Sequence, residues 1–128
     1  MVAYLSEEWL DRAGDALAGS AELSERTADL DLAIGYEVTG APSGKVTYTI
    51  RFDRGTTTLE HPATDAPVSF ALDYESAAAI AQGKVSAQAA FMQGRLKLVG
   101  DVNVMIRDGA VLDGVTDALA DLRTDTDF

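Results

Sequence analysis

The chain has 128 residues, of which 47% are hydrophobic, and its 21 acidic and 10 basic side chains give a net charge of −11. This length and apolar fraction predict a single folded domain over residues 1–128, and the absence of cysteine excludes disulfides and cysteine-ligated zinc. The excess of acids disfavours binding to nucleic-acid phosphates or anionic bilayers. It favours a highly soluble surface or a high-salt cytoplasm, with a basic partner as the alternative.

The start of the sequence has no basic region followed by an apolar run, and no segment approaches the roughly 18 apolar residues of a membrane span. We therefore expect no signal peptide, no stable membrane insertion and a cytoplasmic location.

The first predicted element is an amphipathic helix between Ser6 and Gly19. Ser6 is a suitable N-cap, and Glu7 and Glu8 follow it where the helix dipole favours negative charge. Trp9 lies on the apolar face of this helix, whereas the acidic side chains take the solvent side. We therefore expect the helix to pack against the rest of the domain through Trp9.

Five segments carry the alternation of apolar and polar side chains that is typical of a half-buried strand. They are residues 30–38, 45–53, 56–60, 68–72 and 95–98. In the clearest of them, apolar side chains at one face alternate with polar ones at the other: Val46, Tyr48, Ile50 and Phe52 against Thr47, Thr49 and Arg51. This pattern predicts a five-stranded, largely antiparallel sheet with one apolar face that helices must cover.

Two short helices are predicted between the last two of these strands. Asp73 can cap the first, which ends at Gly83, and Ser86 can cap the second, which ends at Gly94. Their glycine ends fit the usual way in which a helix terminates. Together with the strands, they predict an α+β fold.

A further helix is predicted after Asp101, with a break or kink at residues 108–109. Its apolar stripe consists of Val111, Leu112, Val115, Leu119 and Leu122. A row of acids lies opposite: Asp113, Asp117, Asp121 and Asp125. Like charges four residues apart repel, so this row should face solvent.

Side chains that could support catalysis are sparse in this sequence. His61 is the sole histidine, and one histidine cannot build a metal site of two or three imidazoles. Residues 101–112 begin like a calcium loop, but Met105 occupies a ligand position and Leu112 stands where a glutamate is needed. The glycine spacing in residues 40–45 is too short for a phosphate-binding loop. We therefore predict no catalytic residue, no metal and no cofactor.

Aromatic and flexible apolar side chains are the remaining candidates for a site. Aromatic rings line apolar pockets and methionine adapts to irregular surfaces, but the same residue types also fill ordinary cores. The group consists of Trp9, Phe70, Phe91, Met92, Met105 and Ile106.

The segment VSFALDYESAAAIAQGKVSAQAAFMQGRLKLVGD, residues 68–101, resembles the sterol carrier protein type two family, whose members are also called non-specific lipid-transfer domains. The shared order is a strand, an acidic turn, a helix ending in glycine, a second helix ending in Gln-Gly, a basic-leucine strand and a Gly-Asp pair. In this sequence the turn is Asp73, the first helix ends at Gly83, and Gln93-Gly94 ends the second. The resemblance extends from Leu30 to Leu122.

This resemblance implies an apolar tunnel between the sheet and the helices, open to fatty acids, acyl-CoA, sterols, isoprenoids or phospholipids. Carried over from the family, the residues that bind the ligand are Phe91, Met92, Leu96, Leu98, Met105 and Ile106. Trp9 and Phe70 are added from the pattern of burial.

The sequence therefore predicts a non-catalytic protein that binds and carries apolar lipids, with a lipid-metabolising enzyme as its partner. One alternative is an accessory protein-interaction module of such an enzyme, with a closed core. A second is a small enzyme with a cone-shaped pocket. Its only candidate catalytic residues are Tyr36 or Tyr48 with a nearby acid.

Overall fold

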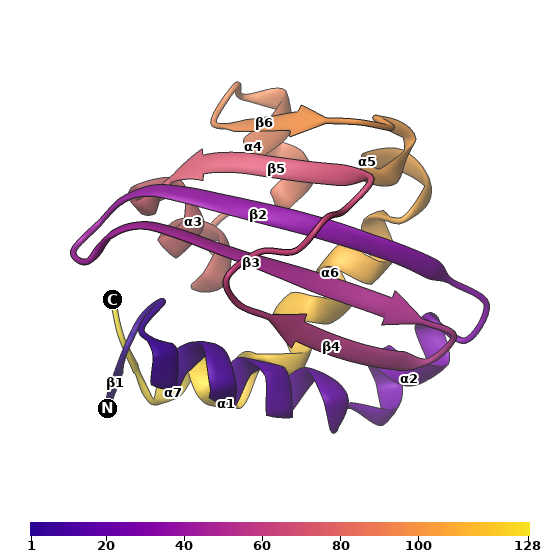
Figure 1. Cartoon of the computed structure of the whole chain (residues 1–128), viewed down its shortest axis with the longest axis horizontal. Coiled ribbons are helices and arrows are strands. Elements are labelled where there is room, and N and C mark those ends of the chain that lie inside the picture. Colours follow the sequence, from indigo (N-terminus) through magenta and orange to yellow (C-terminus); the bar gives the residue numbers. More distant parts are fainter.

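The computed structural model describes the backbone of residues 1–128 and all side chains except those of Met105 and Ile106. Its centre is a five-stranded sheet in the order β4-β3-β2-β5-β6 (Figure 1). The strands are β2 (Asp31–Ala41), β3 (Gly44–Asp53), β4 (Thr56–Glu60), β5 (Val68–Asp73) and β6 (Leu96–Val99). Neighbouring strands are antiparallel except β2 and β5, which are parallel. The predicted α+β class and largely antiparallel sheet are confirmed.

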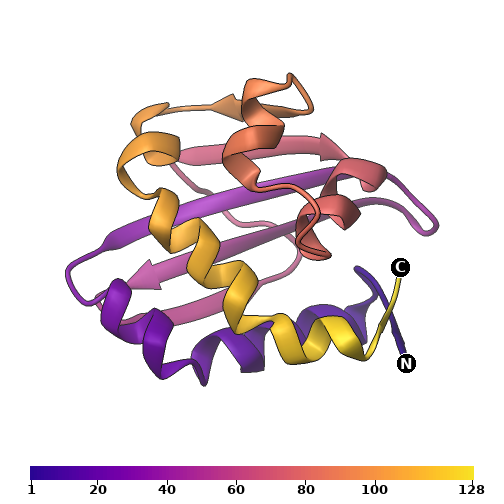
Figure 2. The same cartoon turned by 180° about the vertical axis from the view of Figure 1, so that it is seen from behind.

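Helices cover one face of this sheet, as Figure 2 shows from the helical side. They are α1 (Glu7–Ala18), α2 (Ala21–Arg26), α3 (Tyr74–Ala81), α4 (Ala87–Met92), α5 (Asn103–Arg107), α6 (Gly109–Ala118) and α7 (Ala120–Thr124). The inner face of the sheet is apolar because alternate residues point toward the helices, and Ile34, Ile50 and Phe52 are all buried there. Among the residues that the structure describes, no helix is long and apolar enough to cross a membrane.

The predicted N-caps are confirmed at three helices. The Ser6 hydroxyl accepts the backbone N–H of Trp9 at 3.2 Å, and the Ser86 hydroxyl accepts that of Ala89 at 3.0 Å. The Asp73 carboxylate accepts the backbone N–H of Ser76 at 2.7 Å, and this hydrogen bond lowers the pKa of Asp73. These caps satisfy backbone donors that a helix start otherwise leaves unpaired.

The two ends of the described chain form structure that the sequence pattern did not predict. Val2–Ala3 (β1) pairs in parallel with Thr126–Asp127 (β7), so the ends lie side by side (Figure 1). Helix α2 was also not predicted; Ser20 caps it and Leu23 is its buried anchor. Such short elements have too little periodicity to detect, and tertiary contacts stabilise them.

The C-terminal helix breaks twice rather than once. The predicted break at residues 108–109 separates α5 from α6, and a second break at Leu119 separates α6 from α7. The predicted acidic row therefore does not run along one straight helix. Its last member, Asp125, pairs with Arg12 at 2.8 Å, and this pairing lowers the pKa of Asp125.

The outer face of the sheet is partly covered by the connection between β4 and β5, which crosses it in Figure 1. Thr49 points to this face and is fully buried. Its hydroxyl donates to the Thr64 carbonyl at 3.1 Å and accepts the Thr64 N–H at 3.0 Å. A loop without regular structure thus protects a part of the sheet that the sequence pattern leaves exposed.

Candidate functional site

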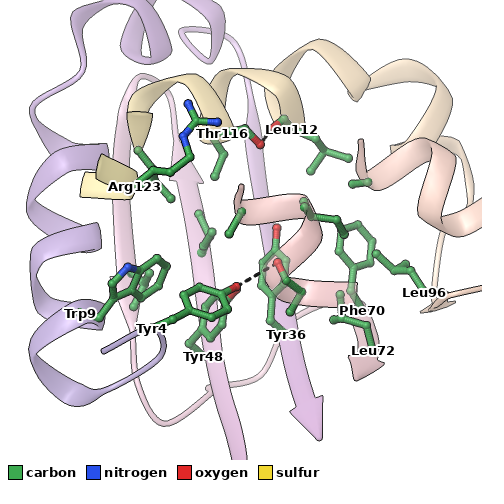
Figure 3. Close-up of a pocket in the computed structure, with 18 of the residues that line it drawn as sticks. Tyr4, Trp9, Tyr36, Tyr48, Phe70, Leu72, Leu96, Leu112, Thr116 and Arg123 are labelled. Atoms are coloured by element: carbon green, nitrogen blue, oxygen red, sulfur yellow. Dashed lines mark hydrogen bonds between the residues drawn. The ribbon is translucent and has the colours of Figure 1, made fainter. Parts of the chain in front are cut away.

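A cavity of about 90 Å³, measured at the centres of a water-sized sphere, lies between the inner face of the sheet and the helices (Figure 3). A single water molecule needs roughly 10–15 Å³ by this measure, so the cavity is several times larger. Most of the side chains that line it are apolar, which offers water few hydrogen bonds. The space is therefore suited to an apolar group.

Three aromatic rings form the sheet wall of the cavity. Tyr36 pairs with Tyr48 across β2 and β3 and with Phe70 across β2 and β5, so strand register places the rings in one row. The Tyr36 and Tyr48 rings stack with centroids 4.7 Å apart and planes 8° from parallel. Tyr36 meets Phe70 edge to face at 5.3 Å and 86°. These geometries are favourable for aromatic pairs and fix the shape of this wall.

Residues near the two ends of the described chain close another side of the cavity. Tyr4 packs edge to face on Trp9 with centroids 4.8 Å apart, and the Phe128 ring lies 4.9 Å from Tyr4. The Trp9 indole N–H donates to the Thr126 hydroxyl at 3.1 Å, and the Tyr4 hydroxyl donates to the Ala77 carbonyl at 3.2 Å. Both polar tips are satisfied, so the aromatic bodies can face the apolar space.

The helical wall comes mainly from α3 and α6, and α7 contributes Arg123. Leu112, Val115 and Leu119 line the cavity from one side, and Arg123 lies at its α7 edge. Figure 3 shows Leu112, Thr116 and Arg123 across the cavity from the tyrosines. The wall is apolar along most of its length and ends in one guanidinium.

The tyrosines that line the cavity are uncharged. Burial raises the pKa of both Tyr36 and Tyr48 well above that of a free phenol, with Tyr48 contributing to the shift of Tyr36. Burial, reinforced by the neighbouring tyrosines, does the same for the pKa of Tyr4. All three phenols are therefore neutral at physiological pH. Among the described residues that line the cavity there is no aspartate, glutamate or histidine side chain.

His61 lies outside this cavity. Its Nε2 is 2.9 Å from a carboxylate oxygen of Asp11, beside α1. No group of three or more histidine, aspartate or glutamate side chains that could hold a metal occurs among the described residues.

The structure brings three of the eight predicted site residues to the cavity: Trp9, Phe70 and Leu96. Phe91 and Leu98 are partly buried against the core and are not among the described lining residues. Met92 is 85% exposed. The reason is helical geometry, since Ala90 is fully buried and residues two apart on a helix point in nearly opposite directions.

The other two predicted site residues, Met105 and Ile106, lie outside the described side chains. A ligand-binding role for each of the eight stays a prediction.

Several lining residues were not among the predicted site residues: Tyr4, Tyr36, Tyr48, Leu112, Val115, Leu119, Arg123 and Phe128. A signal for some of them was present in the sequence. Leu112, Val115 and Leu119 belong to the predicted apolar stripe. Arg123 follows Leu119 by four residues, the spacing that places two side chains on one helix face. The tyrosines carried no such signal, because a strand-core tyrosine and a pocket tyrosine have the same alternation.

Comparison with known proteins gives one family and several similar folds. The family described as the SCP-2 sterol transfer family matches residues 12–113. A conserved hypothetical protein of Thermus thermophilus is 13% identical with a TM-score of 0.76, over 92% of this chain and 88% of the other. A sterol carrier protein 2 crystal structure is 14% identical with a TM-score of 0.73, over 90% and 95%. The sterol carrier protein 2 of Yarrowia lipolytica, in its apo form, is 19% identical with a TM-score of 0.61, over 85% and 87%. No curated protein matches the chain.

A five-stranded sheet covered on one face by helices is the fold that this chain shares with these structures. Since the family match spans most of the sequence, the chain belongs to the SCP-2 sterol transfer family. The resemblance first seen in residues 68–101 is thereby confirmed.

Proposed function

We propose that this protein binds apolar lipids in the cavity between its sheet and helices and carries them without changing them chemically. The observation that supports this most directly is the cavity itself, whose described lining consists mostly of aromatic and aliphatic side chains and includes no acidic side chain. The ligand classes that fit are fatty acids, acyl-CoA, sterols or isoprenoids, and phospholipids. A lipid-metabolising enzyme is the proposed donor or recipient.

Hydrophobic burial supplies enough free energy for such binding. Each buried methylene contributes about 0.8 kcal/mol, and a micromolar dissociation constant corresponds to about 8 kcal/mol. A chain of more than ten methylenes therefore covers this value and leaves a margin for the cost of ordering. No specific polar contact is needed, which favours low selectivity.

The test begins with the protein purified gently from an expression host, extracted with organic solvent and examined by mass spectrometry. We expect a stoichiometric lipid in the extract and displacement of a fluorescent fatty acid by added lipids. Ala81→Phe, which places a ring at the cavity wall, should reduce both signals. Ala110→Phe, on the exposed side of α6, is the matched control and should leave them unchanged.

A clean extract together with no displacement by any lipid would refute the carrier function. The protein-interaction module would then be the better interpretation of the same fold.

A further inference from the structure

Arg123 is the single charged side chain among the described residues that line the cavity. The chain as a whole has 21 acidic side chains, yet the described lining includes none of them. The cavity thus has the opposite charge to the surface around it. A guanidinium at the edge of an apolar space is costly to desolvate unless an anion pairs with it.

No acid lies within ion-pair distance of Arg123 in the described part of the chain. Several other basic residues have such partners: Arg12 with Asp125, Arg26 with Glu22, Arg51 with Glu60, Arg107 with Asp108, and Lys45 with Glu37. Arg123 therefore keeps its hydrogen-bond donors available although acids are abundant in this protein. A planar guanidinium with free donors matches a carboxylate or phosphate in a bidentate manner.

The backbone at the end of α3 leaves room for this guanidinium. A Cβ added at Gly83 would lie 2.7 Å from Arg123 Nη1, and Gly83 has φ of +76°. Glycine is favoured at this position by its left-handed backbone conformation, and the tip of the Arg123 side chain takes the adjacent space. Gly83, which follows the end of α3, therefore lies close to the guanidinium of Arg123.

From these observations we infer that Arg123 binds the anionic head group of a single-chain amphiphile whose tail packs against Tyr36, Tyr48 and Phe70. The inference rests on the proposed function and adds an orientation to it: head at α7, tail toward the sheet. It also adds selectivity, because a neutral head group gains nothing from Arg123. The overall charge of −11 opposes anions in general, so an anionic lipid is held by this local charge.

The experiment compares dodecanoic acid with dodecanol, which share an alkyl chain and differ in head charge. Dissociation constants are measured by calorimetry for the wild type, Arg123→Met and Arg123→Lys. We expect Arg123→Met to weaken binding of the acid by about ten- to a hundredfold, the usual loss for a hydrogen bond to a charged group, and to leave the alcohol within about twofold. Arg123→Lys keeps the charge and should recover part of the affinity for the acid.

Arg51→Met is the matched control, because Arg51 lies on the outer face of the sheet and pairs with Glu60 at 3.1 Å. It removes the same charge and should change neither affinity. Added salt should weaken binding of the acid to the wild type more than to Arg123→Met. Binding of the alcohol to Arg123→Met also reports that the fold and the cavity are intact.

The outcomes separate this inference from the function on which it rests. If the wild type binds both ligands and Arg123→Met leaves the acid unaffected, or weakens both ligands equally, the head-group role is refuted and the carrier function stands. If neither ligand binds the wild type and the lipid extract is also clean, the proposed function itself fails. Dodecyl phosphate keeps the same alkyl chain and is tested in parallel. It should also bind more weakly to Arg123→Met than to the wild type, and an unchanged affinity would count against the head-group role.

Discussion

Tyr36 on β2 lies directly opposite Tyr48 on β3, and their rings stack with centroids 4.7 Å apart. The Tyr36 ring also contacts the Phe70 ring of β5, with the two ring planes nearly perpendicular. One residue of the central strand thus joins the antiparallel and the parallel neighbours of the sheet into one aromatic wall. The Tyr36 ring therefore takes part in both aromatic contacts of this wall.

Removal of the Tyr36 ring should therefore destabilise the folded protein. We expect Tyr36→Ala to lower the free energy of unfolding by about 3–5 kcal/mol, as for other large aromatic truncations in a core. Tyr36→Phe keeps the stack and the edge contact and should stay within about 1 kcal/mol of the wild type. Urea denaturation measures both. Equal destabilisation by the two variants would mean that the hydroxyl, and not the ring, carries the effect.

The raised pKa values of Tyr36 and Tyr48 predict a loss of stability in alkali. An unfolded tyrosine releases its proton near pH 10, whereas burial keeps these two phenols protonated in the folded protein. The folded state then holds more protons than the unfolded state, so the stabilisation is present below about pH 10 and is lost as pH rises above it. The slope should approach about 1.4 kcal/mol per pH unit for each such tyrosine.

This slope can be measured by urea denaturation at a series of alkaline pH values. The double variant Tyr36→Phe/Tyr48→Phe should show a shallower decline than the wild type. Identical slopes for the two proteins would contradict the assignment to these residues.

The Asp73 cap predicts a change in stability at the opposite end of the pH scale. Asp73→Ala should lower the free energy of unfolding at neutral pH by about 1 kcal/mol, because the N–H of Ser76 loses its acceptor. The hydrogen bond lowers the pKa of Asp73, so its contribution is present above the pKa of an unfolded aspartate and is lost as pH falls through the folded value. The difference between wild type and variant should therefore shrink in acid.

Asp73→Ser, which retains a capping oxygen, serves as the comparison and should be nearly neutral in stability. A deficit of Asp73→Ala that is the same at every pH would argue against a charged cap.

The hydrogen bond between Trp9 and Thr126 leads us to expect that the two ends of the described chain stabilise one another. Its hydroxyl accepts the Trp9 indole N–H at 3.1 Å and donates to the Leu122 carbonyl. Thr126→Val keeps the shape of the side chain but leaves the buried indole N–H unpaired, at a cost of about 1–3 kcal/mol. Thermal denaturation followed by tryptophan fluorescence measures the loss.

Thr126→Ser keeps the hydroxyl and is the control for this prediction. A Thr126→Val variant as stable as Thr126→Ser would show that the hydrogen bond contributes little to the attachment of these ends.

Local sequence signals located most of the regular structure. The strands β3 and β4, and the helices that begin after Ser6, Asp73 and Ser86, were predicted close to their observed bounds. These elements depend on a two-residue alternation or on a capping side chain beside its own helix. Both are properties of neighbours along the chain, which a single sequence displays directly.

The prediction of the site was weaker, and Met92 shows why. Its residue type suits a lipid pocket, but its place at the end of α4 turns it to solvent. The short helix has too few residues for the sequence to define which face is buried.

The sequence by itself determined the α+β class, the apolar face of the sheet and the family. Only the tertiary structure decided which side chains surround the cavity, because Tyr36, Phe70 and Arg123 are brought together by strand register and helix packing. The physical reason is the sequence separation over which each effect acts. Backbone preference and alternation act between near neighbours in the sequence. The shape and charge of a cavity depend on contacts between residues far apart in the chain.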